Sequence, residues 1–366
     1  MKRVLIVTAS FGEGHNTASK NIRDAIVSEN PDCEVRISDL YAVTNPRLNR
    51  VMCAGYRVAI NRATRLWHVV FKLFDQPGAI EKTLPLVAKM RDAFGRLAEE
   101  FKPDLVVSTY PIYGFVKDEL ARKGHPLKAP FYTVVTDSTQ INSAWYRRMS
   151  DAFVVPDAPT KECLIRGGIK ENVIHTLGFP VSLRFEKLTP LTAEAQGPWK
   201  ILIMPSTRRS VALRILSTVL ARPDTTVTVI AGRNKNLTEA LKNSPFGSDS
   251  RCKILEWTDQ MPELLASHHL FIGKAGGATV QEAIAAQCPI LISHVVPGQE
   301  EGNIALILQT RIGMLANTRG LLKSSLDLAF GHDAMEWRDW KRNLAQCSKC
   351  GASRNIARFI LKSIKA

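Results

Sequence analysis

Short apolar runs that alternate with amphipathic stretches constrain the fold of this chain more than any other feature. The run Val4–Thr8 is followed by Thr17–Asn30, in which apolar residues recur at helical spacing. Such alternation is typical of a parallel sheet with helices on both faces. The runs that we expect to form strands are Val4–Thr8, Asp104–Ser108, Phe131–Thr136, Ala152–Val155, Ile201–Met204, Thr226–Ala231, Lys253–Leu255, Leu270–Ile272 and Ile290–Ser293.

The alternation stops once and then begins again. The interruption, from Arg184 to Trp199, contains Pro190, Gly197 and Pro198, which are typical of a linker. Because 366 residues suffice for two domains of ordinary size, we expect two Rossmann-like domains whose parallel sheets face an interdomain cleft. The expected boundaries are an N-terminal domain at 1–184, a linker at 185–199, a C-terminal domain at 200–345, and a C-terminal helix at 346–366 that could pack back on the N-terminal domain.

The net charge of the chain points to an anionic partner. The sequence holds 49 Lys and Arg against 34 Asp and Glu, which gives a formal charge of +15. A protein of this charge attracts nucleic acid, acidic lipid surfaces or phosphorylated substrates. Charge alone does not choose among these three.

Several other classes are excluded or not expected. No apolar run reaches the ~20 residues of a membrane-spanning helix, and the N-terminus is interpreted as a first strand, not a signal peptide. The seven scattered cysteines fit reduced thiols in a cytoplasmic protein. The C-x-x-C of Cys347 and Cys350 has no second pair, so a zinc site is not expected.

The segment from Thr44 to Phe74 is rich in basic residues and contains no acidic one. If the segment is helical, its cations form one stripe and its apolar and aromatic residues lie opposite. A helix of this kind can lie on an anionic bilayer, or it can pack against a domain with a solvated basic face. The stripe carries no recognised nucleic-acid motif, so nucleic acid is not an expected partner. The candidate membrane residues are Arg50, Arg57, Arg65, Trp67 and Lys72.

Two glycine-containing loops that follow strands are candidate ligand sites. In the first, Gly12 and Gly14 precede His15, an imidazole that could remove a proton from a hydroxyl, or could cap a turn. In the second, Gly276 and Gly277 open the expected helix Val280–Ala286, and amides at a helix start bind a diphosphate without a metal. A structural strand-to-helix turn is the alternative for the second loop.

Two further loops carry polar residues at strand ends. Gln299 and Glu300 present an amide and a carboxylate, which can recognise sugar hydroxyls, although the same residues also form surface turns. Asp137 follows Phe131–Thr136 and could orient a hydroxyl or a histidine, or could cap the next helix.

Taken together, these segments resemble the monogalactosyldiacylglycerol synthase and processive diacylglycerol glucosyltransferase family, a branch of glycosyltransferase family 28 related to MurG. The similarity runs through VLIVTASFGEGHNTAS, VVTDSTQINSAW, Gly178–Val181, VIAGRNKNL and KAGGATVQEAIAAQCPILISHVVPGQEEGN. The form TASFGEGH is closer to the bacterial glucosyltransferases than to the plant galactosyltransferases.

The resemblance implies an α/β fold of the GT-B type and a metal-independent, inverting hexosyltransferase that needs no cofactor. The donor would be a UDP-sugar, and the acceptor a diacylglycerol-type lipid that a peripheral protein reaches at the cytoplasmic face of an anionic membrane. The oligomeric state is left open. The alternatives are a MurG-like transferase, a UDP-sugar epimerase, or a catalytically weak protein that binds UDP-sugar or lipid.

The same resemblance implies roles for individual residues. His15 would be the catalytic base, with Asp137 as its partner. In the donor site, Gly276, Gly277 and Thr279 would face the diphosphate and Glu282 the ribose. The remaining donor residues are Gln299 and Glu300 at the hexose, Asn303 in the same loop, Gly232, Arg233 and Asn234 on the nucleotide side, and Met261 near uracil.

The chain departs from the family pattern at three places. Ser10 stands where the family often has an aspartate, and Asn142 where the T-D motif is usually followed by a histidine. The glycine-rich loop expected after the first strand of the second domain is replaced by residues 204–210. There Arg208 and Arg209 could supply charge in place of backbone amides.

Overall fold

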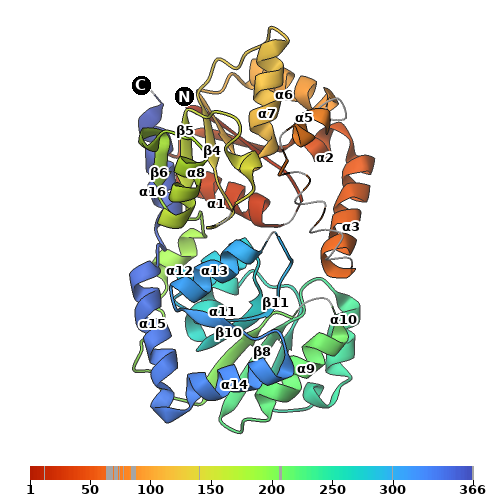
Figure 1. Cartoon of the computed structure of the whole chain (residues 1–366), viewed down its shortest axis with the longest axis vertical. Helices are drawn as coiled ribbons and strands as arrows, with labels where there is room; N and C mark the ends of the chain where they lie inside the picture. Colours follow the sequence, from red (N-terminus) through yellow and green to blue (C-terminus); the bar gives the residue numbers. More distant parts are fainter. Residues whose placement is uncertain are drawn as a thin grey trace. The chain divides into compact units, whose positions relative to one another are not determined.

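Two sheets of parallel strands organise the chain in the computed structural model (Figure 1). The structure describes residues 1–11, 13–62, 69, 73, 75–76, 78–83, 88–139, 141–205, 208–298 and 300–364. Contacts between residues divide the chain into two compact units. The first contains Met1–Leu183, Val296–Gly302 and Gly351–Ala366, and the second contains Arg184–Val295 and Asn303–Cys350.

The first unit holds a six-stranded sheet, counted over the described residues, in the order β2-β1-β3-β4-β5-β6. Every neighbouring pair is parallel. Its elements are β1 (Arg3–Thr8), α1 (Glu13–Glu29), β2 (Glu34–Asp39), α2 (Leu40–Thr44), α3 (Pro46–Arg62), α5 (Ala79–Thr83), α6 (Ala88–Phe101), β3 (Leu105–Ser108), α7 (Ile112–Arg122), β4 (Phe131–Val134), the 3-10 turn η2 (Ser143–Trp145), β5 (Ala152–Val155), α8 (Ala158–Arg166), β6 (Ile174–Thr176) and α16 (Ala352–Ser363).

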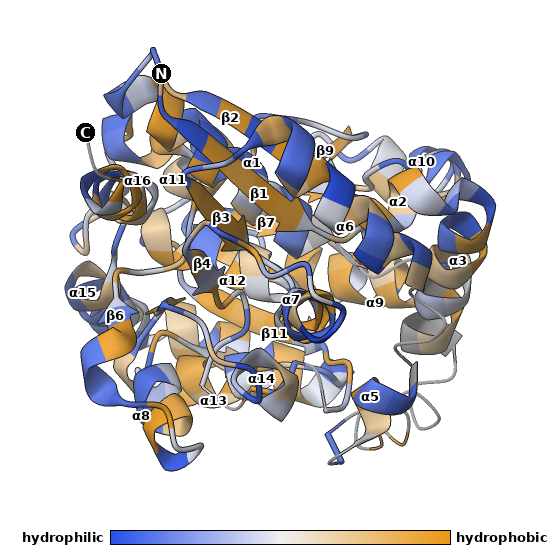
Figure 2. Cartoon of the chain, turned by 90° about the horizontal axis from the view of Figure 1, so that it is seen from above, coloured by the Kyte–Doolittle hydropathy of each residue, from blue (hydrophilic) through white to orange (hydrophobic). Residues whose placement is uncertain are grey.

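The core of this unit lies on both faces of the sheet. On one face, Ile22 and Ile26 of α1 pack with Ile356 and Ile360 of α16 against Val4 and its neighbours. On the other face, α6 and α7 cover Leu5 and Val7. Figure 2 shows the apolar colour concentrated along β1 and β3, as expected for strands covered on both faces. The C-terminal helix α16 therefore belongs to the first unit and lies beside α1.

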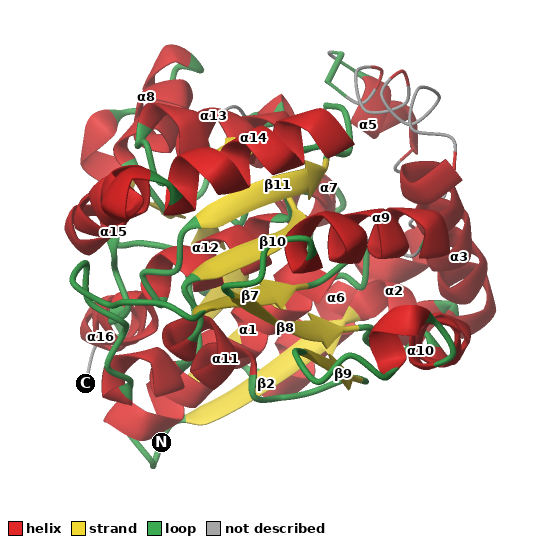
Figure 3. Ribbon diagram, turned by 90° about the horizontal axis from the view of Figure 1, so that it is seen from below, coloured by secondary structure: helices red, strands yellow, loops and turns green. Residues whose placement is uncertain are grey.

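The second unit holds a sheet of six parallel strands, again over the described residues, in the order β12-β11-β10-β7-β8-β9. Its elements are β7 (Trp199–Ile203), α9 (Arg209–Leu220), β8 (Thr225–Ile230), α10 (Lys235–Lys242), β9 (Cys252–Leu255), α11 (Met261–Ser267), β10 (Leu270–Lys274), α12 (Gly277–Ala285), β11 (Ile290–His294), α13 (Glu301–Gln309), β12 (Gly313–Leu315), α14 (Arg319–Phe330) and α15 (Met335–Cys347). Figure 3 shows α9 and α14 lying across one face of this sheet.

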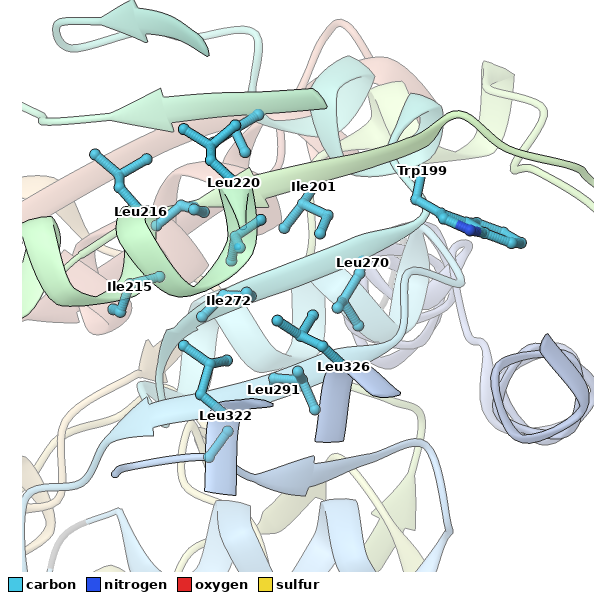
Figure 4. Packing of buried hydrophobic residues seen from close by; sticks show 14 of the residues in the cluster. Trp199, Ile201, Ile215, Leu216, Leu220, Leu270, Ile272, Leu291, Leu322 and Leu326 are labelled. Atoms are coloured by element: carbon cyan, nitrogen blue, oxygen red, sulfur yellow. The ribbon is translucent and has the colours of Figure 1, made fainter. Parts of the chain in front are cut away.

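Aliphatic side chains fill the space between this sheet and those two helices (Figure 4). Ile201, Leu270 and Ile272 come from the strands, and Leu216 and Leu326 come from α9 and α14. Trp199 stacks on Phe330 at the start of β7, with ring centroids 4.5 Å apart. The expected linker 185–199 groups with this unit because the Leu191 amide donates to the Ala266 carbonyl and Trp199 is part of β7.

The expected fold class is confirmed: both halves are α/β with parallel sheets. All nine expected strands are present, and the boundaries of Ala152–Val155 are the same. Three strands, β2, β6 and β12, had no expected counterpart.

Two helices begin earlier than expected, and both changes affect candidate residues. We expected Gly14 and His15 to lie in a loop before a helix at Thr17; instead α1 begins at Glu13, so both lie in its first turn. Likewise α12 begins at Gly277, not at Val280. Glycine costs conformational entropy in a helix, but without a Cβ it leaves the first-turn amides, which lack helical partners, open to close approach by a ligand.

Candidate functional site

The carboxyl edge of the first sheet holds His15. Its Nδ1 lies 3.0 Å from the carbonyl oxygen of Thr109, which follows β3, and 2.7 Å from Oγ1 of Thr136, which follows β4. The Ser19 hydroxyl of the same helix lies 2.8 Å from Oγ1 of Thr109 and fastens α1 to this edge. The imidazole is therefore held by residues that follow two different strands, and Ser19 anchors its helix to the same edge.

These contacts assign the tautomer of His15. A carbonyl oxygen can only accept, so Nδ1 carries the proton that it donates to Thr109. In the neutral imidazole the lone pair is then on Nε2, which has no hydrogen-bond partner among the described residues. Burial lowers the pKa of His15 below its usual value, while the Asp137 charge and the Thr109 carbonyl act in the opposite direction. His15 is thus a neutral base at neutral pH, with Nε2 as its basic atom.

Asp137 lies near His15 but is not its hydrogen-bond partner in the described structure. Its Oδ2 accepts a hydrogen bond of 2.6 Å from Nε1 of Trp145. The expected pairing with His15 is therefore indirect, since the carboxylate acts on the imidazole through its charge.

A cluster of three aromatic rings lies on one side of His15, and sequence reasoning did not single them out. The ring of Tyr110 meets the imidazole edge to face, with centroids 5.0 Å apart. Phe11 stacks on Tyr110 at 5.9 Å and meets Tyr41 edge to face at 5.2 Å. All three rings are half-buried. Each follows a strand of the first sheet within three residues, which is the signal that could have found them.

The carboxyl edge of the second sheet holds the start of α12. Gly276 has extended dihedral angles and is the N-cap, and in the described part of the chain no side chain caps the helix. The residues from Gly276 to Thr279 are half-buried. The first amides of α12 point away from the helix and have no helical partner, so they can bind an anion.

Asn303 fixes the backbone next to this helix start. Its Nδ2 donates a hydrogen bond of 2.8 Å to the carbonyl of Ala275, the residue before Gly276. Its side chain is 5% exposed, and Oδ1 has no hydrogen-bond partner in the described structure. A buried acceptor without a partner is costly, so this oxygen is available for a ligand that donates a hydrogen bond.

Glu282 lies on α12 three residues after Thr279, at a neighbouring position of the helix surface. Burial raises the pKa of its carboxyl to about 7. Among the described residues no cation pairs with it. A carboxyl of this kind gains hydrogen bonds when a hydroxyl-bearing ligand covers it.

The loops after β8 and β9 hold the expected nucleotide-side residues. Gly232 has a φ of +69° and turns the chain, and Oδ1 of Asn234 accepts from the Leu237 amide, so it caps α10. The guanidinium of Arg233 lies 5.0 Å from the ring centre of Trp257, which is 57% exposed. Trp257 was not among the expected residues, although it directly precedes the segment that leads to Met261, the first residue of α11.

The remaining candidates are only partly described. Glu300 is buried and its carboxylate accepts from the Val296 amide at 2.9 Å, so it closes a turn of its own loop. Arg208 is the N-cap of α9, and Arg208 and Arg209 are exposed. Gly12, Gln299, Arg65, Trp67 and Lys72 lie outside the described residues, as does the side chain of Arg57.

Helix α3 differs from the expected two-faced helix. Its protein side carries Asn49, Cys53 and Tyr56, which are half-buried, and the Cys53 thiol donates to the Ser10 carbonyl at 3.4 Å. The exposed side combines Arg50 with apolar residues, which were expected on the opposite face; Met52, for example, is 41% exposed. The exposed aliphatic residues of this helix are Leu48, Val51, Met52 and Val58.

The described residues contain neither a metal-binding cluster nor a membrane-spanning helix. No group of three or more His, Cys, Asp or Glu in these residues is arranged to hold a metal ion. No helix in the described part of the chain has the length and hydrophobicity needed to cross a bilayer.

Comparison with protein families decides the identity of the chain. Residues 15–181 match the model for monogalactosyldiacylglycerol (MGDG) synthase. Residues 206–303 match the model for the C-terminal domain of glycosyltransferase family 28. The chain belongs to the MGDG synthase branch of glycosyltransferase family 28.

Curated relatives of this family-28 chain are named processive diacylglycerol beta-glucosyltransferases. The protein from Staphylococcus carnosus (strain TM300) is 27% identical over 87% of this chain and 82% of its own. The protein from Bacillus subtilis (strain 168) is 25% identical over 99% of this chain and 95% of its own. The chain is therefore a glycosyltransferase.

Solved structures confirm the GT-B fold of this glycosyltransferase. MurG from Acinetobacter baumannii matches with a TM-score of 0.64 at 13% identity, over 99% of this chain and 100% of that one. The UDP-GlcNAc 2-epimerase from Neisseria meningitidis, solved with UDP-GlcNAc, matches with a TM-score of 0.62 at 14% identity, over 98% and 100% of the two chains.

The structure explains two departures of this glycosyltransferase from its family pattern. Ser10 donates a hydrogen bond of 2.5 Å to Oδ2 of Asp39, so a carboxylate from the end of β2 lies beside the position where the family often has one. Asn142 caps η2 by accepting from the Ala144 amide at 2.9 Å. That cap holds Trp145, which in turn binds Asp137.

Proposed function

We propose that this glycosyltransferase moves a hexose from a UDP-sugar to a diacylglycerol-type lipid, with inversion at the anomeric carbon and without a metal. The observation that carries the proposal is the uncapped start of α12 with Asn303 beside it. The names of the curated relatives support the lipid acceptor.

The donor would bind to the second unit. Amides of Gly277 and Thr279 would hold the pyrophosphate, and the unpartnered Oδ1 of Asn303 would accept from a donor hydroxyl. Glu282 would bind the ribose hydroxyls. Trp257, exposed near Met261, offers an apolar surface for the base. Gln299 and Glu300 are retained as candidates for the hexose.

The acceptor would be activated in the first unit. Nε2 of His15 takes the proton of the acceptor hydroxyl as the oxygen forms its bond to the anomeric carbon. The bond from that carbon to the UDP oxygen breaks on the opposite side, and UDP leaves with the electron pair. Attack from the side opposite the leaving group inverts the configuration, and the α12 amides stabilise the charge that develops on UDP.

Metal independence is part of the proposal because helix-end amides can carry out the charge stabilisation that a divalent cation would otherwise supply. The test is transfer in the presence of a chelator. Activity that disappears with EDTA and returns with Mg²⁺ would contradict this part only.

We also propose that the protein is peripheral on the cytoplasmic face of an anionic membrane. Helix α3 exposes two cations, Arg47 and Arg50, which could bind lipid phosphates. The same helix exposes the aliphatic side chains of Leu48, Val51 and Val58, which could enter the acyl region. The seven cysteines are free thiols, which fits a reducing compartment.

The deciding experiment supplies radiolabelled UDP-glucose and UDP-galactose with diacylglycerol in anionic vesicles and separates the lipid products. We expect a labelled glycolipid from at least one donor. Label that appears only in a polyprenyl-linked acceptor would indicate a MurG-like transferase, and interconversion of UDP-sugars without transfer would indicate an epimerase. If the protein binds UDP but neither transfers nor interconverts the sugar, it is a binding protein and not an enzyme.

A further inference from the structure

A buried lysine lies at the opposite end of the helix that would hold the donor phosphates. Lys341 of α15 is 4% exposed. Its Nζ donates a hydrogen bond of 2.6 Å to the carbonyl of Gln287. Gln287 directly follows the C-cap of α12, Ala286, and has a φ of +52°. The cation is therefore placed at the C-terminus of α12, where helix carbonyls concentrate negative partial charge.

A second contact from the same segment holds this end of α12. The Ser348 hydroxyl, one residue beyond α15, donates to the Ala285 carbonyl at 3.2 Å. At the other end, Asn303 holds Ala275. The helix is thus fixed at both termini by side chains from other elements, and Lys341 is the contact among these three that brings a charge.

A cation buried at this place needs an explanation. Burial disfavours the charged form of Lys341, and burying a lysine without a paired carboxylate is costly. A leucine or methionine would fill the same space without this cost. What the lysine adds is a positive charge in line with the helix dipole, and the nine residues of α12 span only about 13 Å.

We propose that Lys341 is a positioning residue for the donor site, which fixes and polarises α12 so that its N-terminal amides bind phosphate more tightly. This inference rests on the proposed donor site. A cation at the C-terminus stabilises the oriented helix, and an anion at the N-terminus does the same. By linkage, each then favours the binding of the other.

The first test uses a ligand with phosphate and a ligand without it. Calorimetry would measure the affinity of UDP and of uridine for the unaltered protein, for Lys341→Met and for Lys341→Arg. We expect Lys341→Met to weaken UDP binding roughly two- to fivefold and leave uridine unchanged, since helix-dipole effects have this size. Lys341→Arg should restore UDP binding. An equal loss for both ligands, or no loss for UDP, would overturn the inference.

The second test uses the unaltered protein and remains informative if the variants do not fold. Burial lowers the pKa of Lys341 to about 8. The titratable groups that face it are Cys288, whose pKa burial raises to about 12, and His269, whose pKa burial lowers to about 4. Neither changes charge between pH 7.5 and 9. Glu282 and the uracil ring titrate near the limits of this range and affect both ligands alike, so the readout is the ratio of the two affinities. UDP affinity should fall relative to uridine affinity as pH rises, and a constant ratio would overturn the inference.

The free energy of unfolding should change with pH in the direction opposite to the UDP affinity. Because the folded pKa of Lys341 lies below the unfolded value, the unfolded chain binds more protons between pH 8 and 10.5, so this lysine makes the fold more stable as pH rises. If Lys341 had only a structural role, its deprotonation would raise the stability of the fold over the same pH range in which we expect UDP binding to weaken. If the unaltered protein does not bind UDP at all, the proposed donor site is wrong and this inference falls with it.

Discussion

The carbonyl oxygen of Thr109 lies 3.0 Å from Nδ1 of His15 and decides which nitrogen of the imidazole is basic. Thr109 follows β3, and His15 lies in the first turn of α1, so the pairing exists only because β1 and β3 are neighbours in the sheet. A backbone carbonyl cannot donate, which leaves the lone pair on Nε2. The geometry thus prepares His15 to accept a proton.

Replacement of His15 by alanine should abolish most of the activity and spare donor binding. General bases typically contribute 10²- to 10⁴-fold, so we expect kcat to fall by roughly this factor. UDP affinity, measured by calorimetry, should remain within about twofold because the donor residues lie on other elements. His125→Ala is a matched control, since that imidazole is exposed on the same unit. Full transfer activity in His15→Ala would remove His15 from the mechanism.

Replacement of Asp137 by asparagine should shift the pH profile in a defined direction. The carboxylate raises the pKa of His15, so loss of its charge lowers that pKa further. The base then stays unprotonated at lower pH, and the acid limb of kcat/KM should move to lower pH. The amide oxygen of the new side chain can still accept from Trp145, so the fold should be unaffected. An acid limb that stays in place or moves to higher pH would show that the charge of Asp137 does not raise the pKa of His15.

Replacement of Glu282 by glutamine should stabilise the protein and weaken donor binding. Burial raises the folded pKa of Glu282 to about 7, above its unfolded value. The folded chain therefore holds a proton that the unfolded chain releases, and stability is lost as pH rises from 4.5 through 7. Glutamine does not titrate, so at about pH 8 we expect a gain of about 1–3 kcal/mol in the free energy of unfolding, which vanishes below about pH 4.5.

The same variant should bind UDP about tenfold more weakly, because a hydrogen bond to a charged acceptor is replaced by a neutral one. Denaturant titration at about pH 4.5 and about pH 8 measures the gain in the free energy of unfolding, and calorimetry measures the loss of UDP affinity. Glu239→Gln on α10 is a control at a site outside the proposed donor site. A stability gain with unchanged UDP binding would place Glu282 outside the donor site.

The sequence predicted the central strands well and the sheet edges poorly. Ala152–Val155 is buried at every position and was found with its correct boundaries. The three strands that were missed, β2, β6 and β12, all lie at a sheet edge. Edge strands are less buried, so the apolar run that signals a strand is weak there, as in Glu34–Asp39, where polar residues alternate with apolar ones.

The sequence supplied the candidate residues of the site but not the contacts that hold them in place. Glycines near helix starts led to the prediction of two ligand-binding edges, and the structure places them at the starts of α1 and α12, each of which follows a strand. The contacts that fix the site join distant segments: Thr109 is 94 residues from His15, and Asn303 is 28 residues from Ala275. Strand order brings these residues together, and no local pattern in the sequence encodes it. Lys341 was missed for the same reason.

Variants of α3 should separate two components of membrane binding. Replacing Arg47 and Arg50 by serine should weaken adsorption to anionic vesicles by roughly fivefold per residue at low salt, since each surface cation contributes about 1 kcal/mol. This loss should shrink as salt rises. Replacing Val51 and Val58 by serine should weaken adsorption by about tenfold at any salt, because 67% and 56% of these side chains is exposed and can enter the acyl region.

Vesicle co-sedimentation at two salt concentrations measures both effects. Matched controls lie on α14, where Leu321 and Leu328 are 45% and 44% exposed and Arg319 is exposed. Serine at those positions should leave adsorption unchanged. If the α3 and α14 variants lose adsorption equally, binding follows net charge and average surface hydrophobicity. If only the arginine variants lose it, α3 touches the headgroups without inserting its aliphatic side chains.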